Sequence, residues 1–296
     1  MKPFNYRILR KYIKDDGINF FTDQYLRSLN IYSLYYKETK KDFFTLNDKQ
    51  IGGDRRVVTV NKNKYEYELD IYDDDTDEDN KRKEISIINL EEKGIDCGIL
   101  IVDKQTNEGN IQSISNYKSC LKCLEKNDDY KTGDIIVQIL LARAKKLKLK
   151  KISLEDNSHI SCNKIKIPLI SIRTMTRGEP YYCKFGFRPV DKFGKNKYEH
   201  NKNLFNSKPT IDRDVLLEIL SDNIFDSKLI KYIKKNIIPE LGYEKTSVEY
   251  FIKLLITKII DFNSQEACEL LITIHYKISD MVGYKTYGSK IFELKL

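Results

Sequence analysis

The sequence predicts an α/β (α+β) fold, in which a mixed central sheet carries flanking helices and a helical addition lies near the C-terminus. Three observations predict it. Short segments with strand-like patterns follow one another between residues 64 and 117. A segment of helical length and another short strand-like segment come next, which is the order of a parallel crossover. Most of the chain from 211 to 282 then has helical periodicity.

The length and composition allow a large core. The chain has 296 residues, of which 41% are hydrophobic, enough for one large domain or two modest ones. It contains no run of about 18 apolar residues, so we expect no transmembrane helix and no membrane partner. The N-terminal stretch MKPFNYRILRKYIKDDG lacks the apolar core of a signal peptide, and we therefore expect a cytoplasmic location.

The net charge of +8 arises from 52 basic and 44 acidic residues, which are interleaved through most of the chain. The composition is rich in Lys, Asn, Ile and Tyr and lacks Trp, a bias that an AT-rich coding sequence produces by itself. The positive charge is therefore weak support for nucleic-acid binding, which we keep only as a minor alternative.

Six cysteines are scattered through the chain: Cys97, Cys120, Cys123, Cys162, Cys183 and Cys268. A disulfide framework is typical of small secreted domains, so we expect reduced thiols here. Cys120 and Cys123 form a C-x-x-C, but a zinc site needs a second pair or histidines at short spacing. The three histidines are far apart in the sequence, and we predict no metal site.

Residues 1–60 are predicted to be an N-terminal segment with helical and aromatic character, and the sequence does not decide whether it belongs to the core or packs outside it. Five of its residues are spaced as one face of a helix: Phe20, Phe21, Tyr25, Leu29 and Tyr32. IGGDRR, at 51–56, predicts a turn, and the alternating pattern at 64–72 predicts a strand. The acidic run at 73–83 is expected to be a solvated loop, because it lacks the internal Gly of an EF-hand calcium loop.

Three further strands are predicted at 84–92, 97–105 and 109–117. The second is almost continuously apolar, so we expect it to be a central strand that is buried on both faces. TNEG, at 106–109, predicts the hairpin turn that joins the second strand to the third.

A helix is predicted from Thr132 to 151, because Ile136, Leu140, Ala144 and Leu147 share one face. Its end is rich in Lys, which suits the C-terminus of a helix. A short strand follows at 151–158 and stops at an Asp-Asn-Ser cluster. We therefore expect a parallel crossover of strand, helix and strand.

The next segments alternate between helix and strand. Pro168 is expected to open a short helix within 165–179, and Gly178 to end it. A short strand is expected after Gly186, which allows the chain to bend tightly.

The helical part that follows has stop signals at Pro239, Gly242 and Gly283. The last segment, SKIFELKL, alternates apolar and polar residues like a strand.

This order of elements, together with Y-x-x-x-G-F in YYCKFGF, resembles the Gcn-type N-acetyltransferase (GNAT) superfamily. The resemblance implies a GNAT-like mixed sheet with an acyl-CoA-binding core at 61–198. Residues 199–285 would then be a helical insertion, and 286–296 would hold the last strand of the core. Divergent members with such additions are found in large DNA viruses, whose AT-rich genomes would also account for the composition.

The resemblance implies that acetyl-CoA is the co-substrate. Its pantetheine arm would pair with a strand at 119–125, along Cys120, Leu121, Lys122 and Cys123. Its diphosphate would lie at the N-terminus of the next helix, where free N–H groups and the helix dipole favour anions. The residues there are Lys131, Thr132, Gly133, Asp134 and Ile135.

This loop departs from the family pattern in two respects. Only one glycine remains, and Asp134 introduces a carboxylate where phosphate would bind. Thr132 or Asp134 could instead cap the helix, since both residue types do so well. The basic run at 143–151 is either a binding site for the 3′-phosphate or a solvated helix end, and the second interpretation is favoured.

In the family, the tyrosine that matches Tyr182 protonates the leaving thiolate, a role for which a phenol pKa of about 10 is well matched. The alternative is a core aromatic beside Phe185 and Phe187. Glu155 or Asp156 would serve as the base, unless they only turn the chain.

The predicted function is transfer of an acetyl group to an amine, of a protein or a small molecule, by direct attack in a ternary complex. The alternative is a catalytically inactive GNAT-fold binding or structural protein, which the reduced glycine loop and Asp134 favour. The sequence identifies neither the acceptor amine nor the oligomeric state.

Overall fold

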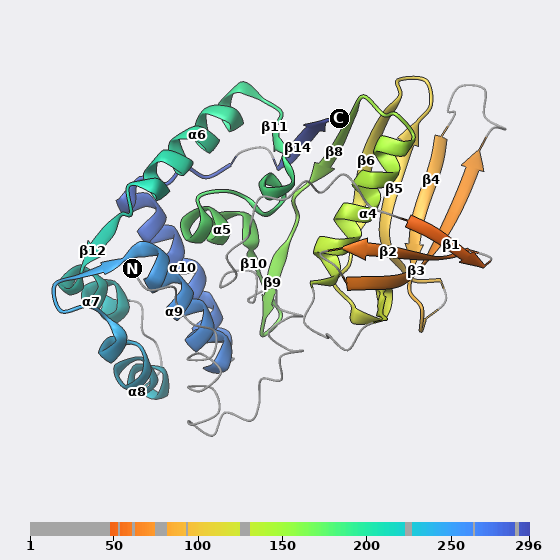
Figure 1. Cartoon of the computed structure of the whole chain (residues 1–296). Helices are drawn as coiled ribbons and strands as arrows, with labels where there is room; N and C mark the ends of the chain where they lie inside the picture. Colours follow the sequence, from red (N-terminus) through yellow and green to blue (C-terminus); the bar gives the residue numbers. More distant parts are fainter. Residues whose placement is uncertain are drawn as a thin grey trace. The chain divides into compact units, whose positions relative to one another are not determined.

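The structure is a computed structural model of the whole chain (Figure 1). The chain divides into two units, Met1–Lys37 and Glu38–Leu296. The structure describes residues 48–296 except 53, 61–62, 75–81, 93, 125–130, 223–226, 263 and 288–289, all within the second unit. The predicted helical face between Phe20 and Tyr32 lies outside the described residues, as does most of the acidic run at 73–83.

The main sheet is mixed and has ten strands among the described residues. Its strands are β1 (Asp48–Gly52), β2 (Arg55–Val60), β3 (Asn63–Asp74), β4 (Arg82–Ile88), β5 (Asp96–Asp103), β6 (Glu108–Ile114), β7 (Lys122–Cys123), β8 (Lys151–Glu155), β11 (Arg188–Pro189) and β14 (Ile291–Lys295). Their order is β1-β2-β3-β4-β5-β6-β8-β14-β11, and β7 pairs with β3 outside this path. A large mixed sheet with helices confirms the α+β class.

The predicted antiparallel meander is confirmed by strands β3 to β6, each of which pairs with the next. β5 lies between β4 and β6, as its apolar sequence predicts, but it is fully buried on one face only: Leu100 and Val102 are buried, whereas Ile99 and Ile101 are half-buried. The turn predicted at 51–56 is shorter than expected. β1 and β2 form a hairpin, in which β1 extends to Gly52 and β2 begins at Arg55.

The predicted parallel crossover is also confirmed. After the 3-10 turn η1 (Lys118–Cys120), helix α4 (Thr132–Lys146) leads to β8, which pairs in parallel with β6. α4 lies against β5 and β6 (Figure 1). The approach is close because Gly98 of β5 has no side chain: a Cβ there would lie 2.5 Å from Ile136 Cγ2.

The segment after β8 contains more structure than the sequence predicts. A hairpin of β9 (His159–Cys162) and β10 (Ile165–Pro168) precedes α5 (Leu169–Arg177). Gly178 ends α5 with φ 80°, and Gly186 ends the 3-10 segment η2 (Tyr181–Phe185) with φ 96°. Both glycines therefore have the left-handed conformation that their predicted roles require.

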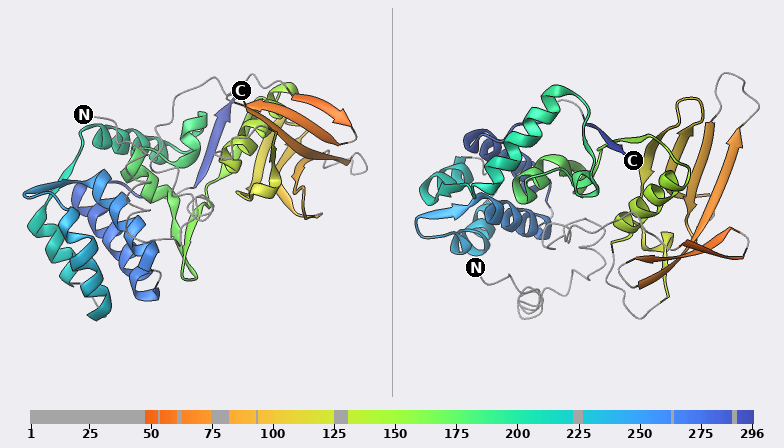
Figure 2. Two further views of the ribbon diagram at one scale, coloured as in Figure 1. Left: turned by 60° about the horizontal axis from the view of Figure 1, so that its bottom comes forward. Right: turned by 45° about the horizontal axis from the view of Figure 1, so that its top comes forward.

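The helical part comprises α6 (Lys192–Asn206), α7 (Arg213–Asp222), α8 (Ser227–Asn236), η3 (Ile238–Glu240), α9 (Val248–Phe262) and α10 (Gln265–Val282), with a small hairpin of β12 (Thr210–Asp212) and β13 (Lys245–Ser247). α9 and α10 run side by side, and α5 packs against α9 (Figure 2). Sequence patterns missed α6, because polar residues dominate it and Tyr198 is its only large buried side chain.

The C-terminal strand is confirmed as a sheet strand. β14 pairs antiparallel with β8 on one side and with β11 on the other. The helices α6 to α10 therefore lie, along the chain, between two neighbouring strands of one sheet.

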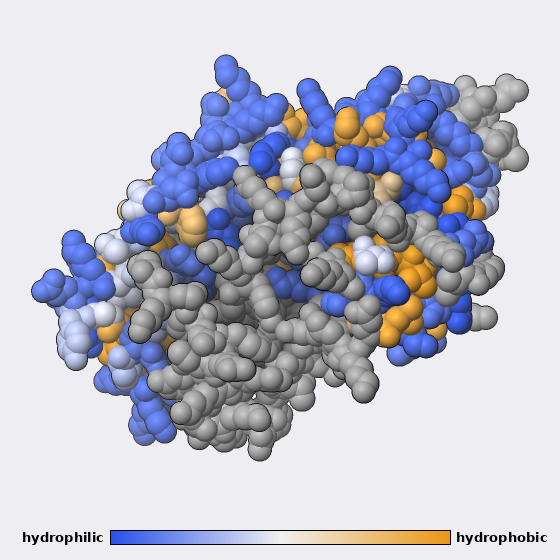
Figure 3. Space-filling view, viewed as in Figure 1, coloured by the Kyte–Doolittle hydropathy of each residue, from blue (hydrophilic) through white to orange (hydrophobic). Residues whose placement is uncertain are grey.

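The described surface seen in Figure 3 is mostly hydrophilic, with small hydrophobic patches between charged side chains. None of the helices in the described part of the chain combines the length and apolar character needed to cross a bilayer.

The prediction of six reduced thiols is wrong for four cysteines. Cys97 bonds to Cys120, and Cys162 bonds to Cys268, whereas Cys123 and Cys183 are free. The partners are 23 and 106 residues apart in the sequence, so spacing alone does not reveal that folding brings them together. Disulfides are rare in cytosolic proteins, and the expected cytoplasmic location loses the support of reduced thiols.

We expect the Cys162–Cys268 bond, which ties β9 to α10, to contribute more stability than Cys97–Cys120. The chain-entropy model gives about 5 kcal/mol for the longer loop and about 3 kcal/mol for the shorter one. Replacing Cys162 and Cys268 by Ala should therefore lower Tm more than replacing Cys97 and Cys120, measured by thermal denaturation without reductant. Cys123→Ala is the control, and an unchanged Tm in the Cys162/Cys268 variant would contradict the bond.

His275 of α10 is a buried histidine. Nδ1 donates to the Leu271 carbonyl oxygen at 3.3 Å, and Nε2 has no hydrogen-bond partner among the described residues. Burial lowers the pKa of His275, because the charged ring would lose its water.

The unfolded chain should therefore take up a proton near pH 6.5 that the folded chain resists. The free energy of unfolding should fall as the pH drops below that value, and His275→Leu should reduce this dependence. Urea denaturation at pH 7.5 and pH 5 tests this, with His159→Leu at an exposed position as the control. Equal pH dependence in His275→Leu and the wild type would contradict it.

Candidate active site

The candidate site lies where the parallel strands β6 and β8 separate. Their pairing covers four residue pairs, from Glu108–Lys151 to Ile111–Leu154. β6 then continues without a strand partner on the β8 side among the described residues, while β8 stays paired with β14. The ends of parallel strands in open α/β sheets are where ligands commonly bind.

Two β-bulges lie at this end of the meander. The register between β5 and β6 shifts so that Gln112 is an extra residue in β6. The register between β4 and β5 shifts so that Cys97 is an extra residue in β5. Bulges bend a strand and often occur beside functional sites, because they redirect side chains and end the pairing.

The prediction that a strand at 119–125 lies beside the strand that follows the crossover helix is wrong. Lys118–Cys120 is η1, and Lys122–Cys123 is β7, which pairs with β3 at Tyr65 and Glu66. The strand that precedes α4 and pairs with β8 is β6. The sequence analysis did predict the strand that corresponds to β6. It did not predict η1 and β7, the two short elements between β6 and α4.

Of the four residues predicted there, Cys120 and Leu121 are buried, Cys123 is half-buried and Lys122 is exposed. Cys120 is bonded to Cys97 and is not a free thiol. None of them comes from β6 or β8, the two strands that separate.

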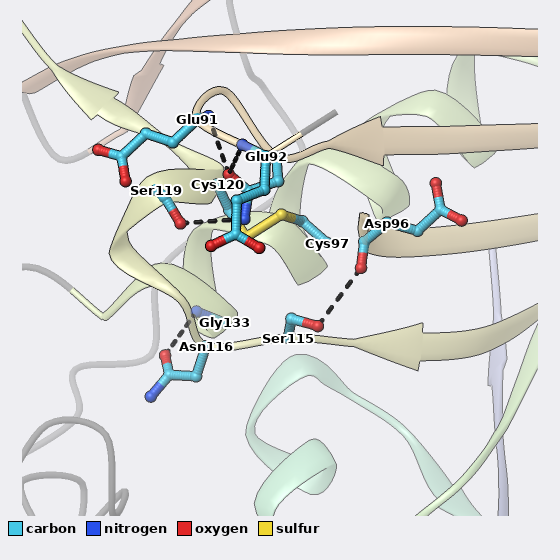
Figure 4. Close-up of a disulfide and its surroundings, with 10 residues drawn as sticks. Glu91, Glu92, Asp96, Cys97, Ser115, Asn116, Ser119, Cys120 and Gly133 are labelled. Carbon is cyan, nitrogen blue, oxygen red and sulfur yellow. Dashed lines mark hydrogen bonds between the residues drawn. A yellow bond between two sulfur atoms is a disulfide. The ribbon is translucent and has the colours of Figure 1, made fainter. Parts of the chain in front are cut away.

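The first turn of α4 is capped by a residue that the sequence did not single out. Lys131 is the N-cap residue and makes no side-chain cap, so capping by Thr132 or Asp134 is wrong. Instead, the Gly133 N–H donates to Asn116 Oδ1 at 3.0 Å (Figure 4). Thr132 and Ile135 are buried. Asn116 comes directly after β6, a position from which a polar side chain can reach the next helix.

The segment that carries Asn116 is fixed to the sheet (Figure 4). The disulfide joins Cys97 to Cys120, and the Ser115 N–H donates to the Cys97 carbonyl oxygen at 2.7 Å. Asn89 Nδ2 donates to Ser119 Oγ at 3.0 Å. The segment from Ser115 to Cys120 is therefore held by a covalent bond and by hydrogen bonds, and its Asn116 is bonded to the first turn of α4.

Asp134 faces the YYCKFGF segment. Its carboxylate accepts hydrogen bonds from the Tyr181 hydroxyl and from Lys184 Nζ, the latter at 2.6 Å. The Tyr181 ring also lies 4.7 Å from the Arg173 guanidinium and 4.2 Å from Lys184 Nζ. The two segments that the resemblance assigns to the site are thus in direct contact, through Asp134 and through Tyr181 and Lys184, to which the sequence analysis assigned no role.

Tyr182 has a different environment from Tyr181. It is half-buried. The centre of its ring lies 5.0 Å from that of Tyr181 and 6.4 Å from that of Phe187. Its hydroxyl has no hydrogen bond to any residue that the structure describes. Burial, and then the negative charges of Asp156 and Asp134, raise the pKa of Tyr182. The phenol therefore remains protonated at neutral pH and lies within electrostatic reach of both carboxylates.

Asp156 follows β8 directly and is 1% exposed. Its Oδ1 accepts hydrogen bonds from the Ser158 N–H and hydroxyl, while Oδ2 has no partner among the described residues. Burial raises the pKa of Asp156 above its ordinary value, and the bonds from Ser158 oppose this shift. Glu155 is exposed and pairs with Ile291 of β14. Of the two predicted carboxylates, Asp156 is the one that acts on Tyr182.

The basic run at 143–151 lies at the other end of α4. A helix of 15 residues is about 22 Å long, so this run is far from Gly133. Arg143 Nη2 donates to the Tyr67 hydroxyl inside the core, and Lys151 pairs with Glu108 and Glu293. These contacts favour the interpretation as a helix end over a 3′-phosphate site beside Gly133.

No protein-family model matches the chain, and no curated protein and no solved structure matches it either. Among the described residues, no group of three or more His, Cys, Asp or Glu side chains is close enough to hold a metal ion.

Asp156→Asn should leave the protein at least as stable as the wild type at neutral pH. A raised pKa means that the folded state favours the protonated carboxyl, so its stability contribution is lost as the pH rises above the ordinary value of 3.8. An amide keeps the acceptor for Ser158 and carries no charge.

Urea denaturation at pH 4.5 and pH 7.5 measures the free energy of unfolding. The difference between Asp156→Asn and the wild type should shift in favour of the variant at the higher pH. Glu155→Gln, at the exposed neighbouring position, should show no such shift. A loss of more than about 1 kcal/mol in Asp156→Asn at pH 7.5 would mean that the carboxylate has a stabilising partner.

Proposed function

We propose that the protein is an acetyl-CoA-dependent N-acetyltransferase that transfers the acetyl group directly to an amine. One observation carries the proposal. The first turn of the crossover helix contacts the segment that carries Tyr182, which the resemblance matches to the proton donor: Asp134 accepts hydrogen bonds from Tyr181 and Lys184, and the Tyr182 ring packs on Tyr181. Asp156, at the end of β8, contributes to the raised pKa of Tyr182. The resemblance requires these three elements to meet at the acyl group.

The order of elements supports the same proposal. An antiparallel meander leads through α4 to β8, and Y-x-x-x-G-F follows in η2 and β11. Beyond Ile111, the backbone of β6 has no strand partner on the β8 side among the described residues. The pantetheine arm would pair there, along 112–114, instead of along 119–125.

Each residue then has a defined task. The amine attacks the thioester carbonyl, a C–N bond forms, and the C–S bond breaks to release the CoA thiolate. Asp156 accepts the amine proton, which its raised pKa favours. The raised pKa of Tyr182 makes it a hydrogen-bond donor to the thiolate, and a proton returned from solvent or Asp156 completes the thiol.

This task for Tyr182 differs from the simple match of pKa values that the sequence predicts. A phenol whose pKa is raised by burial releases its proton less readily than a free phenol. Its contribution is therefore to stabilise the leaving thiolate by a hydrogen bond in a site with little water.

The second candidate is an inactive protein with the same fold. The Gly133 N–H is already bonded to Asn116, and Asp134 adds a carboxylate to the first turn of α4. Both features reduce the capacity of this turn for phosphate. Binding of acetyl-CoA without release of CoA in the presence of amines would favour this candidate.

Tyr182→Phe should lower kcat by about 10²-fold and leave the Kd for acetyl-CoA within about twofold, because the lost hydroxyl acts on the leaving group. Calorimetry gives the Kd, and thiol release from acetyl-CoA with a panel of peptide and polyamine acceptors gives kcat. Tyr243→Phe is the control, since Tyr243 is an exposed tyrosine of the helical part and lies outside the candidate site. Equal loss of binding and turnover in Tyr182→Phe would contradict its role, and no binding by the wild type at millimolar acetyl-CoA would overturn the function.

A further inference from the structure

A largely buried ion pair joins η2 to the first turn of α4. Lys184 Nζ lies 2.6 Å from Asp134 Oδ2, and the two side chains are 8% and 20% exposed. The Tyr181 hydroxyl donates to Oδ1 of the same carboxylate. Both oxygens of Asp134 are therefore bound by partners from the YYCKFGF segment.

The charge of Lys184 is also fixed in place by two aromatic rings. Nζ lies 4.2 Å from the centre of the Tyr181 ring and 4.8 Å from that of Phe185. A cation over an aromatic face is attracted by the ring quadrupole. Lys184 therefore cannot leave Asp134 without also losing these contacts.

The position of Asp134 explains why this charge matters. A carboxylate in the first turn of a helix interacts well with the helix dipole, but it repels an anionic ligand at the same end. A lysine bound to that carboxylate makes the pair neutral. The helix dipole then acts on a phosphate without an opposing charge. The N–H groups of Gly133, Asp134 and Ile135 are bonded to Asn116 and Lys131, so the charge balance at this turn decides how it acts on a phosphate.

We propose that Lys184 is a positioning residue for the diphosphate-bearing part of acetyl-CoA. It cancels the charge of Asp134, the carboxylate that stands where the phosphate would bind, and it holds η2 with Tyr182 against α4. Lys184 does not touch the reacting atoms. The inference rests on the proposed N-acetyltransferase function.

Two thioesters separate this role from a purely structural one. Acetyl-CoA carries the phosphates, and acetyl-pantetheine carries the same reacting group without them. Lys184→Met should raise the KM for acetyl-CoA about 10-fold and leave the KM for acetyl-pantetheine within about twofold, because the uncovered carboxylate repels only the phosphates. Lys166→Met removes one exposed lysine and is the control for net charge.

Asp134→Asn makes the inference testable even if Lys184→Met does not fold. The amide still accepts the Tyr181 hydrogen bond, while Lys184 keeps a positive charge that the phosphates can use. Its KM for acetyl-CoA should be equal to or lower than that of the wild type, and adding it to Lys184→Met should restore the KM.

The outcomes are distinct. Equal loss with both thioesters in Lys184→Met, or a higher KM for acetyl-CoA in Asp134→Asn, would make the pair a structural link and overturn the inference alone. A wild type that uses neither thioester would overturn the proposed function and this inference together.

Discussion

The parallel pairing of β6 with β8 is the constraint on which the rest of the described structure depends. Parallel strands cannot be joined by a hairpin, so the chain must cross over the sheet, and α4 is that crossover. The crossover returns the C-terminal ends of both strands to one edge. The segments that follow the two strands carry Asn116, which is bonded to Gly133 at the start of α4, and Asp156, whose charge contributes to the raised pKa of Tyr182.

The helices between β11 and β14 are part of this framework. β14 must return to lie between β8 and β11, so both ends of the helical part are anchored in the sheet. The Cys162–Cys268 bond adds a covalent link between α10 and the hairpin that follows β8. α5 packs on α9 and leads into η2, so the helical part also supports the segment that carries Tyr182.

The two carboxylates that raise the pKa of Tyr182 differ in how many of their oxygens have a hydrogen-bond partner. Asp134 has a partner for each oxygen, one of which is a cation, whereas Asp156 has partners for Oδ1 only, among the described residues. A buried carboxylate that lacks partners lowers stability. Such groups are common where function requires a shifted pKa, which is why Asp156 is the stronger candidate for proton transfer and Asp134 for binding.

The sequence by itself determined the strands β3 to β6, the crossover through α4 to β8, the last strand, and the bends at Gly178 and Gly186. These features depend on local periodicity and on backbone conformations that neighbouring residues set. Only the tertiary structure decided which cysteines are bonded, that Asn116 caps α4, that Lys184 neutralises Asp134, and that Tyr181 and Tyr182 have different partners. These are contacts between side chains far apart in the sequence, and their geometry exists only after the sheet and the helices have packed.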